Sequence, residues 1–254
     1  MKRWIALAIV AVLMITLLAG CGAPAKKKIV VGLDDHFPPM GFRDDKINIV
    51  GFDVDMAKEA AKRLGMEVEF KPIDWNSKEA ELNGKRIDML WNGLTITEKR
   101  KENILFSNAY MENKQIIVVA AKSPLKTKAS LAGKVVGVQD GSSSIEAVEK
   151  EAAVAKSFKE LKKYPDNVAA LMDLKAGRID ALVVDEIVGR YYIAKKVGDY
   201  AVLSENFGSE EYGVGMRKDD KDLQAKLQKA LDEMKKDGTS AKISQQWFGA
   251  NIVK

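Results

Sequence analysis

The sequence predicts an α/β protein of two similar lobes, and three observations lead to this class. The first hundred residues alternate short β-branched runs with helical patterns that end at glycines. The same alternation recurs between residues 135 and 184. About 230 residues remain after the N-terminal apolar segment, enough for one large domain or two smaller ones. Because alternating strands and helices build parallel pairs, we expect each lobe to be a mostly parallel sheet flanked by helices.

The first lobe is expected to run strand, helix, strand, helix, strand. Residues 29–33 form a β-branched run, and residues 51–64 place apolar side chains at helical spacing. Apolar residues then alternate with acids at 68–70, which indicates a second strand. Ser77 can cap a helix that ends near a glycine, and residues 87–91 are the next apolar strand.

The second lobe repeats this order, and a helical segment follows it. Strands are expected at 135–138 and 179–184, with helices beginning at Ile145 and spanning 167–176. Residues 223–234 then repeat apolar side chains at helical spacing, and a second apolar stripe follows. We interpret these stripes as packing faces rather than sites.

The N-terminus is typical of an exported lipoprotein. Lys2 and Arg3 precede the uncharged run 4–18, and small residues then lead to Cys21. We predict a signal peptide over 1–20 and a lipidated tether over 21–27. Cys21 would carry the acyl chains, such as palmitate, that attach the protein to the outer face of the cell membrane. The alternative is a retained anchor helix, but the run is shorter than the roughly 20 residues that span a bilayer.

Composition excludes several classes of function. Cys21 is the only cysteine and His36 the only histidine, so an internal disulfide, a histidine-based metal cluster and a Ser-His-Asp triad are not expected. Without Lys2 and Arg3, 39 basic residues face 36 acidic ones and the net charge falls from +5 to +3, too mild to indicate nucleic acid. No phosphate-binding glycine motif occurs, so we expect no cofactor.

The first lobe offers a binding site for a carboxylate. Arg100 lies three residues after Thr97, which resembles a helix N-cap, and Gly93 and Thr95 lie on the loop before it. A planar guanidinium can hold a carboxylate through two parallel hydrogen bonds. The alternative is a solvated charge on the helix face, beside Lys99.

The second lobe and the strand ends offer further polar and aromatic candidates. The loop 140–144 joins a strand to a helix N-terminus, which favours an anion, although it is also an ordinary cap. Asp185 ends a strand at its carboxyl end, where ligands bind in α/β sheets, and its charge suits an ammonium group. Phe37 and Trp75 also follow strands and can enclose a side chain, unless they are simply core. Asp34 and Asp35 are adjacent, so on a strand they point to opposite faces and form an improbable catalytic dyad.

Ordered motifs across the chain resemble one family, the substrate-binding proteins of polar amino-acid ABC importers (extracellular solute-binding proteins, family 3). The motifs are Gly51-Phe52-Asp53-Val54-Asp55, Gly93-Leu94-Thr95-Ile96-Thr97 with Arg100, Phe106-Ser107 and Tyr110. The resemblance covers essentially the whole mature chain. It implies a two-lobed, type II periplasmic-binding-protein-like fold.

The resemblance assigns roles to individual residues. It implies that Gly93, Thr95 and Arg100 bind the ligand α-carboxylate and that Asp185 holds the α-ammonium group. The remaining candidates are expected around the ligand side chain or on the second-lobe loop: Asp34, Phe37, Trp75, Gln139, Ser142 and Ser143. Several relatives carry a lysine or an apolar residue at the position of Gln139, so side-chain preference does not transfer. Asp34 favours a polar or basic ligand.

The resemblance also implies the division of the chain and its mode of action. Lobe 1 is expected over 28–112 and 211–254, lobe 2 over 114–208, and a two-stranded hinge near 112–114 and 208–211. The lobes would close on a free L-amino acid, and the closed monomer would deliver it to the permease subunits of an ABC importer. Two alternatives remain: a ligand sensor, and a cyclohexadienyl dehydratase-like enzyme, for which Glu186 could be the general acid.

Overall fold

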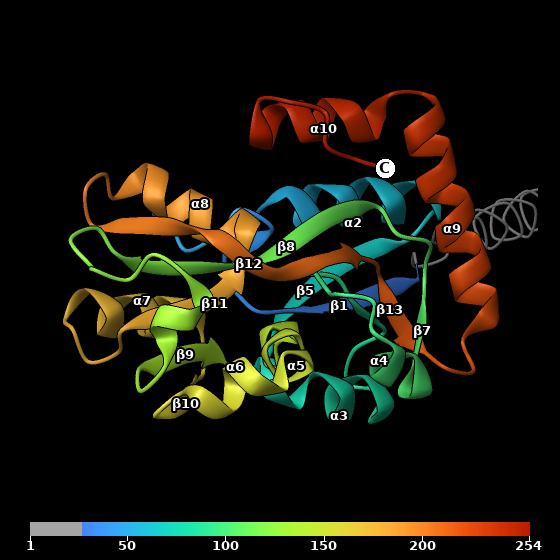
Figure 1. The fold of residues 1–254 in the computed structure, drawn as a ribbon. Helices are drawn as coiled ribbons and strands as arrows, with labels where there is room; N and C mark the ends of the chain where they lie inside the picture. The colour runs from blue at the N-terminus through green and yellow to red at the C-terminus, as the bar shows by residue number, and fades with distance from the viewer. Residues whose placement is uncertain (1–26) are drawn as a thin grey trace, which may run out of the picture.

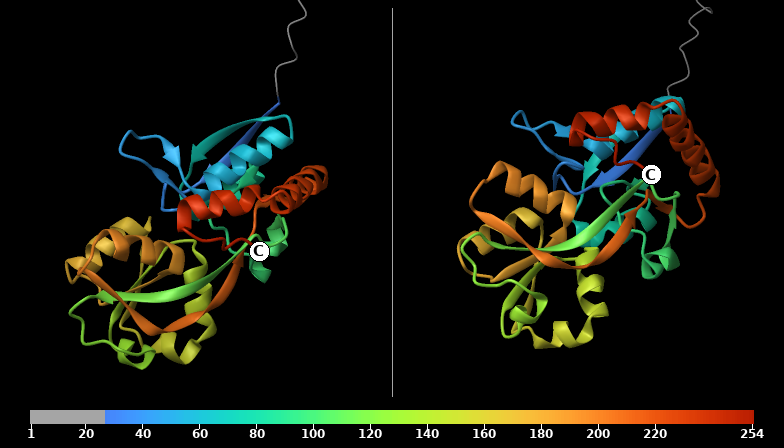
Figure 2. Two further views of the ribbon diagram at one scale, coloured as in Figure 1. Left: turned by 90° about the horizontal axis from the view of Figure 1, so that it is seen from above. Right: turned by 45° about the horizontal axis from the view of Figure 1, so that its top comes forward.

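The computed structural model describes residues 27–254, and two five-stranded sheets dominate it. The signal peptide, Cys21 and nearly all of the tether lie outside the described residues. Figures 1 and 2 show two groups of elements, with β8 and β12 running between them. We call the group that begins at residue 28 the first lobe and the other the second lobe.

The first-lobe sheet has the order β5-β1-β6-β13-β7. Its strands are β1 (Lys28–Leu33), β5 (Glu67–Pro72), β6 (Met89–Leu90), β7 (Ile104–Phe106) and β13 (Gly215–Arg217). Strand β1 pairs in parallel with β5 and β6, while β13 pairs antiparallel with β6 and β7. A small sheet of β2 (His36–Phe37), β3 (Gly41–Arg43) and β4 (Ile49–Val50) extends from the end of β1.

The second-lobe sheet has the order β10-β9-β11-β8-β12. Its strands are β8 (Met111–Ala120), β9 (Val135–Gln139), β10 (Glu160–Tyr164), β11 (Ala181–Asp185) and β12 (Tyr200–Tyr212). Strand β9 pairs in parallel with β10 and β11, whereas β8 pairs antiparallel with β11 and β12.

The sheets are therefore mixed, which corrects the expectation of mostly parallel sheets. In each sheet the parallel pairs come from strands joined through helices, as the alternating pattern predicts. The antiparallel pairs come from strands that enter or leave a lobe directly, without an intervening helix: β8 and β12 in the second lobe and β13 in the first. The two-lobed α/β class itself agrees with the prediction.

Helices cover the sheets, with bounds close to the apolar periodicities. They are α2 (Phe52–Arg63), α3 (Lys78–Asn83), α4 (Glu98–Asn103), α5 (Ser143–Lys150), α6 (Ala152–Ser157), α7 (Asn167–Lys175), α8 (Glu186–Lys195), α9 (Lys221–Lys236) and α10 (Thr239–Phe248). Thr97 caps α4, accepting a hydrogen bond from the Arg100 backbone N–H at 3.2 Å. Ser77 occupies the N-cap position of α3, but its side chain makes no capping bond. Asp74 instead caps the preceding 3-10 turn, Trp75–Ser77.

The core follows the apolar faces of the strands and of the long C-terminal helix. On α9, Leu227, Ala230, Leu231 and Met234 are buried, which confirms the predicted packing stripe. Helices α9 and α10 pack on α2 and on each other, as Figure 1 also shows. No helix within residues 27–254 is both long and apolar enough to span a bilayer.

Two strands connect the lobes and run side by side where they cross. Strands β8 and β12 are antiparallel, with Glu211 opposite Glu112 and Glu210 opposite Asn113. Thr95 forms an isolated bridge with Tyr212, so the loop after β6 lies directly on this crossing. Side chains of both lobes therefore meet where β8 and β12 cross, beside the loop that follows β6.

Candidate functional site

Polar side chains from both lobes meet where the parallel strands end. Asp34 follows β1, Gln139 ends β9 and Asp185 ends β11, while Thr95 and Arg100 follow β6. All five are buried in the closed arrangement of the two lobes. We call the space between the lobes where these five side chains meet the cleft, and it is the candidate site.

Arg100 is a buried cation in the first lobe. Only 5% of its surface is exposed, and its guanidinium donates to the Thr95 carbonyl at 2.9 Å and to the second-lobe Gly141 carbonyl at 3.0 Å. Burial lowers the pKa of Arg100 from its ordinary value. It forms no ion pair within residues 27–254. The solvated-face alternative is therefore wrong, because the side chain is buried between carbonyl oxygens of the two lobes.

A chain of hydrogen bonds joins the lobes beside Arg100. Gln115 Nε2 donates to Ser143 Oγ at 3.2 Å, and Ser143 Oγ lies 2.9 Å from Thr95 Oγ1. Thr95 Oγ1 in turn donates to Glu210 Oε1 at 2.9 Å. Because hydroxyl groups both donate and accept, these side chains can turn toward an anion without losing every partner.

Asp185 is a buried carboxyl group on the other side of the cleft. It is 4% exposed, and its Oδ1 accepts from Asn113 Nδ2 at 2.7 Å and from the Tyr212 hydroxyl at 2.6 Å. Burial raises the pKa of Asp185 well above its ordinary value, and the neighbouring Glu210 carboxylate adds to the effect. Asp185 forms no ion pair among the residues that the structure describes. Asp185 occupies the N-cap position of α8 but makes no side-chain capping bond there, so a plain strand-ending cap does not explain it.

Asp34 and Gln139 form a second contact between the lobes. Gln139 Nε2 donates to Asp34 Oδ2 at 2.7 Å, and Asn167 Nδ2 donates to Gln139 Oε1 at 3.1 Å. Burial raises the pKa of Asp34 above its ordinary value. These side chains form a polar end to the cleft.

The two aromatic candidates, Phe37 and Trp75, are both buried in the first lobe, in different core clusters. Phe37 belongs to the main core cluster, and a Cβ at Gly93 would lie 2.8 Å from its ring. Gly93 also has φ +58°, so glycine suits this position for two reasons. Its N–H donates to the buried Asp53 carboxylate at 2.6 Å. Trp75 packs in a separate cluster with Leu82 and Ile87, so both aromatics belong to the core, and their contact with a ligand stays a prediction.

The loop 140–144 is held mainly by hydrogen bonds to other residues of the second lobe. Ser142 Oγ donates to the Gln139 carbonyl at 2.7 Å, and Ser144 Oγ donates to Gln115 Oε1 at 2.6 Å. Of the loop hydroxyls, only that of Ser143 contacts the first lobe among the described residues. The Ser142 side chain is thus the candidate least directed toward the cleft.

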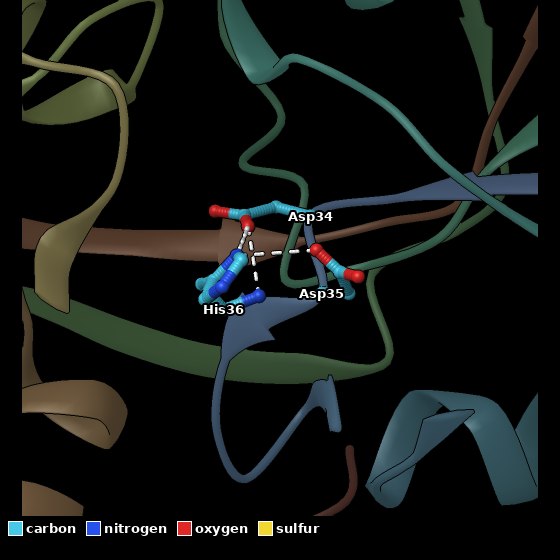
Figure 3. Close-up of side chains that lie close together, drawn as sticks. All are labelled: Asp34, Asp35 and His36. Carbon is cyan, nitrogen blue, oxygen red and sulfur yellow. Dashed lines mark hydrogen bonds and ion pairs between the residues drawn. The ribbon is translucent and has the colours of Figure 1, made fainter. Parts of the chain in front are cut away.

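Asp34, Asp35 and His36 lie close together beside the cleft, and Figure 3 shows His36 facing both acids. His36 Nδ1 lies 3.1 Å from Asp35 Oδ1 and 3.8 Å from Asp34 Oδ1. The acids have separate partners, since Arg43 pairs with Asp35 while Gln139 contacts Asp34. This arrangement explains the three residues without a metal ion.

Four cleft residues escaped the sequence reasoning: Lys78, Asn113, Gln115 and Glu210. Asn113 and Gln115 alternate along β8 and are buried, so polar residues on the inward face of a strand were the available signal. Glu210 accepts from both, at 2.7 and 2.9 Å. Its role depends on the pairing of β12 with β8, which no local pattern reveals.

Two α/β lobes joined by crossing strands around a buried polar cleft define a two-lobed solute-binding protein. The chain belongs to the bacterial extracellular solute-binding proteins, family 3, whose family model matches residues 29–250. This confirms the resemblance drawn from the motifs.

Relatives in this family are amino-acid-binding proteins. The chain is 35% identical over 228 residues to the L-cystine-binding protein TcyJ of Escherichia coli, covering 89% of this chain and 84% of TcyJ. It is 33% identical over 258 residues to the arginine-binding extracellular protein ArtP of Bacillus subtilis, covering 98% of each. A Streptococcus pneumoniae ABC uptake transporter substrate-binding protein with bound histidine matches with a TM-score of 0.86 and 38% identity, covering 89% of this chain and 94% of that chain.

Proposed function

We propose that this protein captures a free L-amino acid, polar or basic, between its lobes and delivers it to an ABC-type importer. One observation carries the proposal: a buried cation, Arg100, and a buried carboxyl group, Asp185, share one cleft, and neither forms an ion pair within residues 27–254. Buried charges are costly unless they are paired. A zwitterion supplies a partner for each, and relatives that bind histidine, arginine and cystine support the same reading.

The carboxylate of the ligand would bind on the Arg100 side. The guanidinium already donates to two carbonyl oxygens there, and Thr95 and Ser143 offer hydroxyl groups beside it. Helix α5 begins at Ser143, so its free backbone N–H groups add to the positive potential. Gly93 lets the rings of Phe37 and Tyr212 pack directly against the backbone of this loop.

The ammonium group of the ligand would bind Asp185. Asn113 and Tyr212 hold the Asp185 carboxylate in place, and Glu210 reinforces the negative potential. The approach of an ammonium group favours the ionised carboxylate, so binding would lower the raised pKa of Asp185 and release a proton.

The ligand side chain would extend toward Asp34 and Gln139, between the rings of Phe37 and Trp75. Asp34 is an acid in a buried setting, so a cationic or hydrogen-bonding side chain would stabilise it. Ser142 would shape the loop beneath the ligand through its bond to the Gln139 carbonyl. A polar or basic amino acid fits best with the acidic and amide groups of Asp34 and Gln139.

Closure of the lobes would assemble the site. We place the lobe boundaries at 28–112 with 211–254 and at 114–208, with the hinge near 112–114 and 208–211, where β8 and β12 cross. Hinge closure around a ligand is the usual motion of this class. The closed monomer would then be what the permease subunits bind.

Export and anchoring belong to the same proposal. Family members are extracellular or periplasmic binding proteins. Cys21, after the predicted signal peptide 1–20, would carry the lipid that holds the mature protein at the membrane, with 21–27 as its tether. An enzyme on this fold gains no support, because the Glu186 carboxylate pairs with Arg190 on α8.

A thermal-shift screen tests the proposal. The purified protein is unfolded and refolded to remove bound ligand, then heated with each common L-amino acid and with L-cystine. At a hundredfold excess over Kd, a ligand stabilises the folded state by about 2.7 kcal/mol, which raises Tm by several degrees. We expect the largest rise with one or a few basic or polar amino acids. A flat result across the panel would contradict amino-acid binding.

A further inference from the structure

Lys78 is a buried lysine at the edge of the cleft, and the binding scheme above does not use it. It is the first residue of α3 and only 4% exposed. Its Nζ donates to the second-lobe Gly141 carbonyl at 2.8 Å and to the Trp75 carbonyl at 3.2 Å. The same nitrogen lies 5.3 Å from the centroid of the Trp75 ring.

Lys78 lacks a charged partner in the part of the chain that the structure describes. Its direct acceptors are two neutral carbonyl oxygens, and it forms no ion pair there. Burial lowers the pKa of Lys78 to about 7, and the positive charge of Arg100 contributes. Glu79, Asp140 and Glu146 also face it and act in the opposite direction. A lysine usually avoids such burial unless a charge compensates it.

Lys78 and Arg100 converge on a single atom. Both are first-lobe cations, and both donate to the Gly141 carbonyl oxygen of the second lobe, at 2.8 and 3.0 Å. Glu79 and Glu146 act on both charges without bonding to either, so the direct acceptor that the two cations share is one neutral oxygen. The N-terminus of α5 adds positive potential close by. The corner of the cleft between these groups is therefore suited to an anion, and a carboxylate has two oxygens with which to meet two cations.

We propose that Lys78 is a second binding residue for the ligand carboxylate, acting together with Arg100 when the lobes close. This inference rests on the proposed function and adds a specificity to it, the preference for a free carboxylate over a neutral amide. A carboxylate beside Lys78 favours its ammonium form, so binding draws a proton onto Lys78 at pH values above its ligand-free pKa. The contribution of Lys78 to affinity is thus full below pH 7 and declines as the pH rises.

The test compares wild type, Lys78→Met and Lys78→Arg by isothermal titration calorimetry. The ligand is the L-amino acid with the largest shift in the thermal screen, measured beside its α-amide. Lys78→Met keeps the length of the side chain and removes the charge. We expect it to weaken binding of the free acid about tenfold or more at pH 7 and to change binding of the α-amide less than about twofold. Lys78→Arg should keep most of the affinity for the free acid.

Proton uptake gives a second readout. Titrations at pH 8 in two buffers of different ionisation enthalpy count the protons exchanged on binding. Because Asp185 also exchanges protons, the informative quantity is the difference between wild type and Lys78→Met. We expect wild type to take up more protons than the variant, by up to one per ligand.

The outcomes separate this inference from the proposed function. If free acid and α-amide weaken equally in Lys78→Met, Lys78 only ties the lobes together through Gly141 and the inference is wrong. If the variant binds the free acid as wild type does, the inference is wrong as well. If no amino acid binds wild type at all, the proposed function fails and this inference fails with it. The Tm of each variant, measured without ligand, shows that it folds.

Discussion

Arg100→Ala is expected to lower the affinity for every amino-acid ligand about a thousandfold, which corresponds to about 4 kcal/mol. The loss is common to all ligands because each carries the same α-carboxylate. Arg100 is buried, so the carboxylate would be left in the cleft without the two parallel hydrogen bonds of a guanidinium. Calorimetric titration with the best ligand of the screen measures the effect.

The matched control for this prediction is Arg178→Ala. Arg178 belongs to the second lobe, is largely exposed and pairs with Asp173 outside the cleft. This control should bind as wild type does. An Arg100→Ala protein that binds within tenfold of wild type would show that the carboxylate is held elsewhere.

Asp185→Asn is expected to lose most ligand affinity and yet to melt at a higher temperature than wild type without ligand. The loss of affinity, on the order of a hundredfold or more, follows from removing the partner of the ammonium group. The gain in stability follows from removing a carboxyl whose pKa is raised by burial. The amide oxygen of asparagine can still accept the bonds from Asn113 and Tyr212.

The raised pKa of Asp185 determines how the difference in Tm between wild type and Asp185→Asn changes with pH. The folded state holds the proton of Asp185 more tightly than the unfolded state, whose ordinary carboxyl pKa is about 3.9. The contribution of Asp185 to the stability of wild type therefore falls as the pH rises above about 4, and the variant lacks this decline. The gap in Tm between the two should widen from pH 4 upward.

Asp237→Asn provides the opposite control. Hydrogen bonds from Thr239 lower the pKa of Asp237 to about 2, so its charge stabilises the folded state at neutral pH. This variant should melt slightly lower than wild type and bind ligand unchanged. A fall in the Tm of Asp185→Asn at pH 7, or retained affinity, would refute the account of Asp185.

Much of the fold follows from local sequence pattern. The remaining parts depend on pairing between residues that are far apart in the chain. Strands β1, β9 and β11 and helix α9 agree with their apolar periodicity, because each buries one face or both. No local pattern reveals that β8 and β12 lie side by side across the lobes, and only the family resemblance predicts a two-stranded connection there. That pairing, which makes the sheets mixed, joins residues about a hundred positions apart and has no local signature.

The candidate site divides in the same way. Arg100, Thr95 and Gly93 stand out in the sequence because they lie close to the predicted helix N-cap Thr97 and within a motif of the family. Lys78 lies in a charged segment that ordinarily indicates a solvated helix face. Its Nζ contacts Gly141, 63 residues away in the second lobe, and that contact exists only because the lobes meet. Residues whose environment is created by closure are therefore those that sequence reasoning misses.

The most direct test of the central claim is a crystal structure of the protein with the amino acid that the thermal screen selects. We expect the α-carboxylate on Arg100 and Thr95, the ammonium group on Asp185, and the side chain toward Asp34. The central claim is contradicted if the ligand lies outside the cleft, for example in the groove of about 640 Å³ lined by Phe42, Tyr191 and Trp247. It is contradicted equally if the ligand lies in the cleft with its carboxylate on another group.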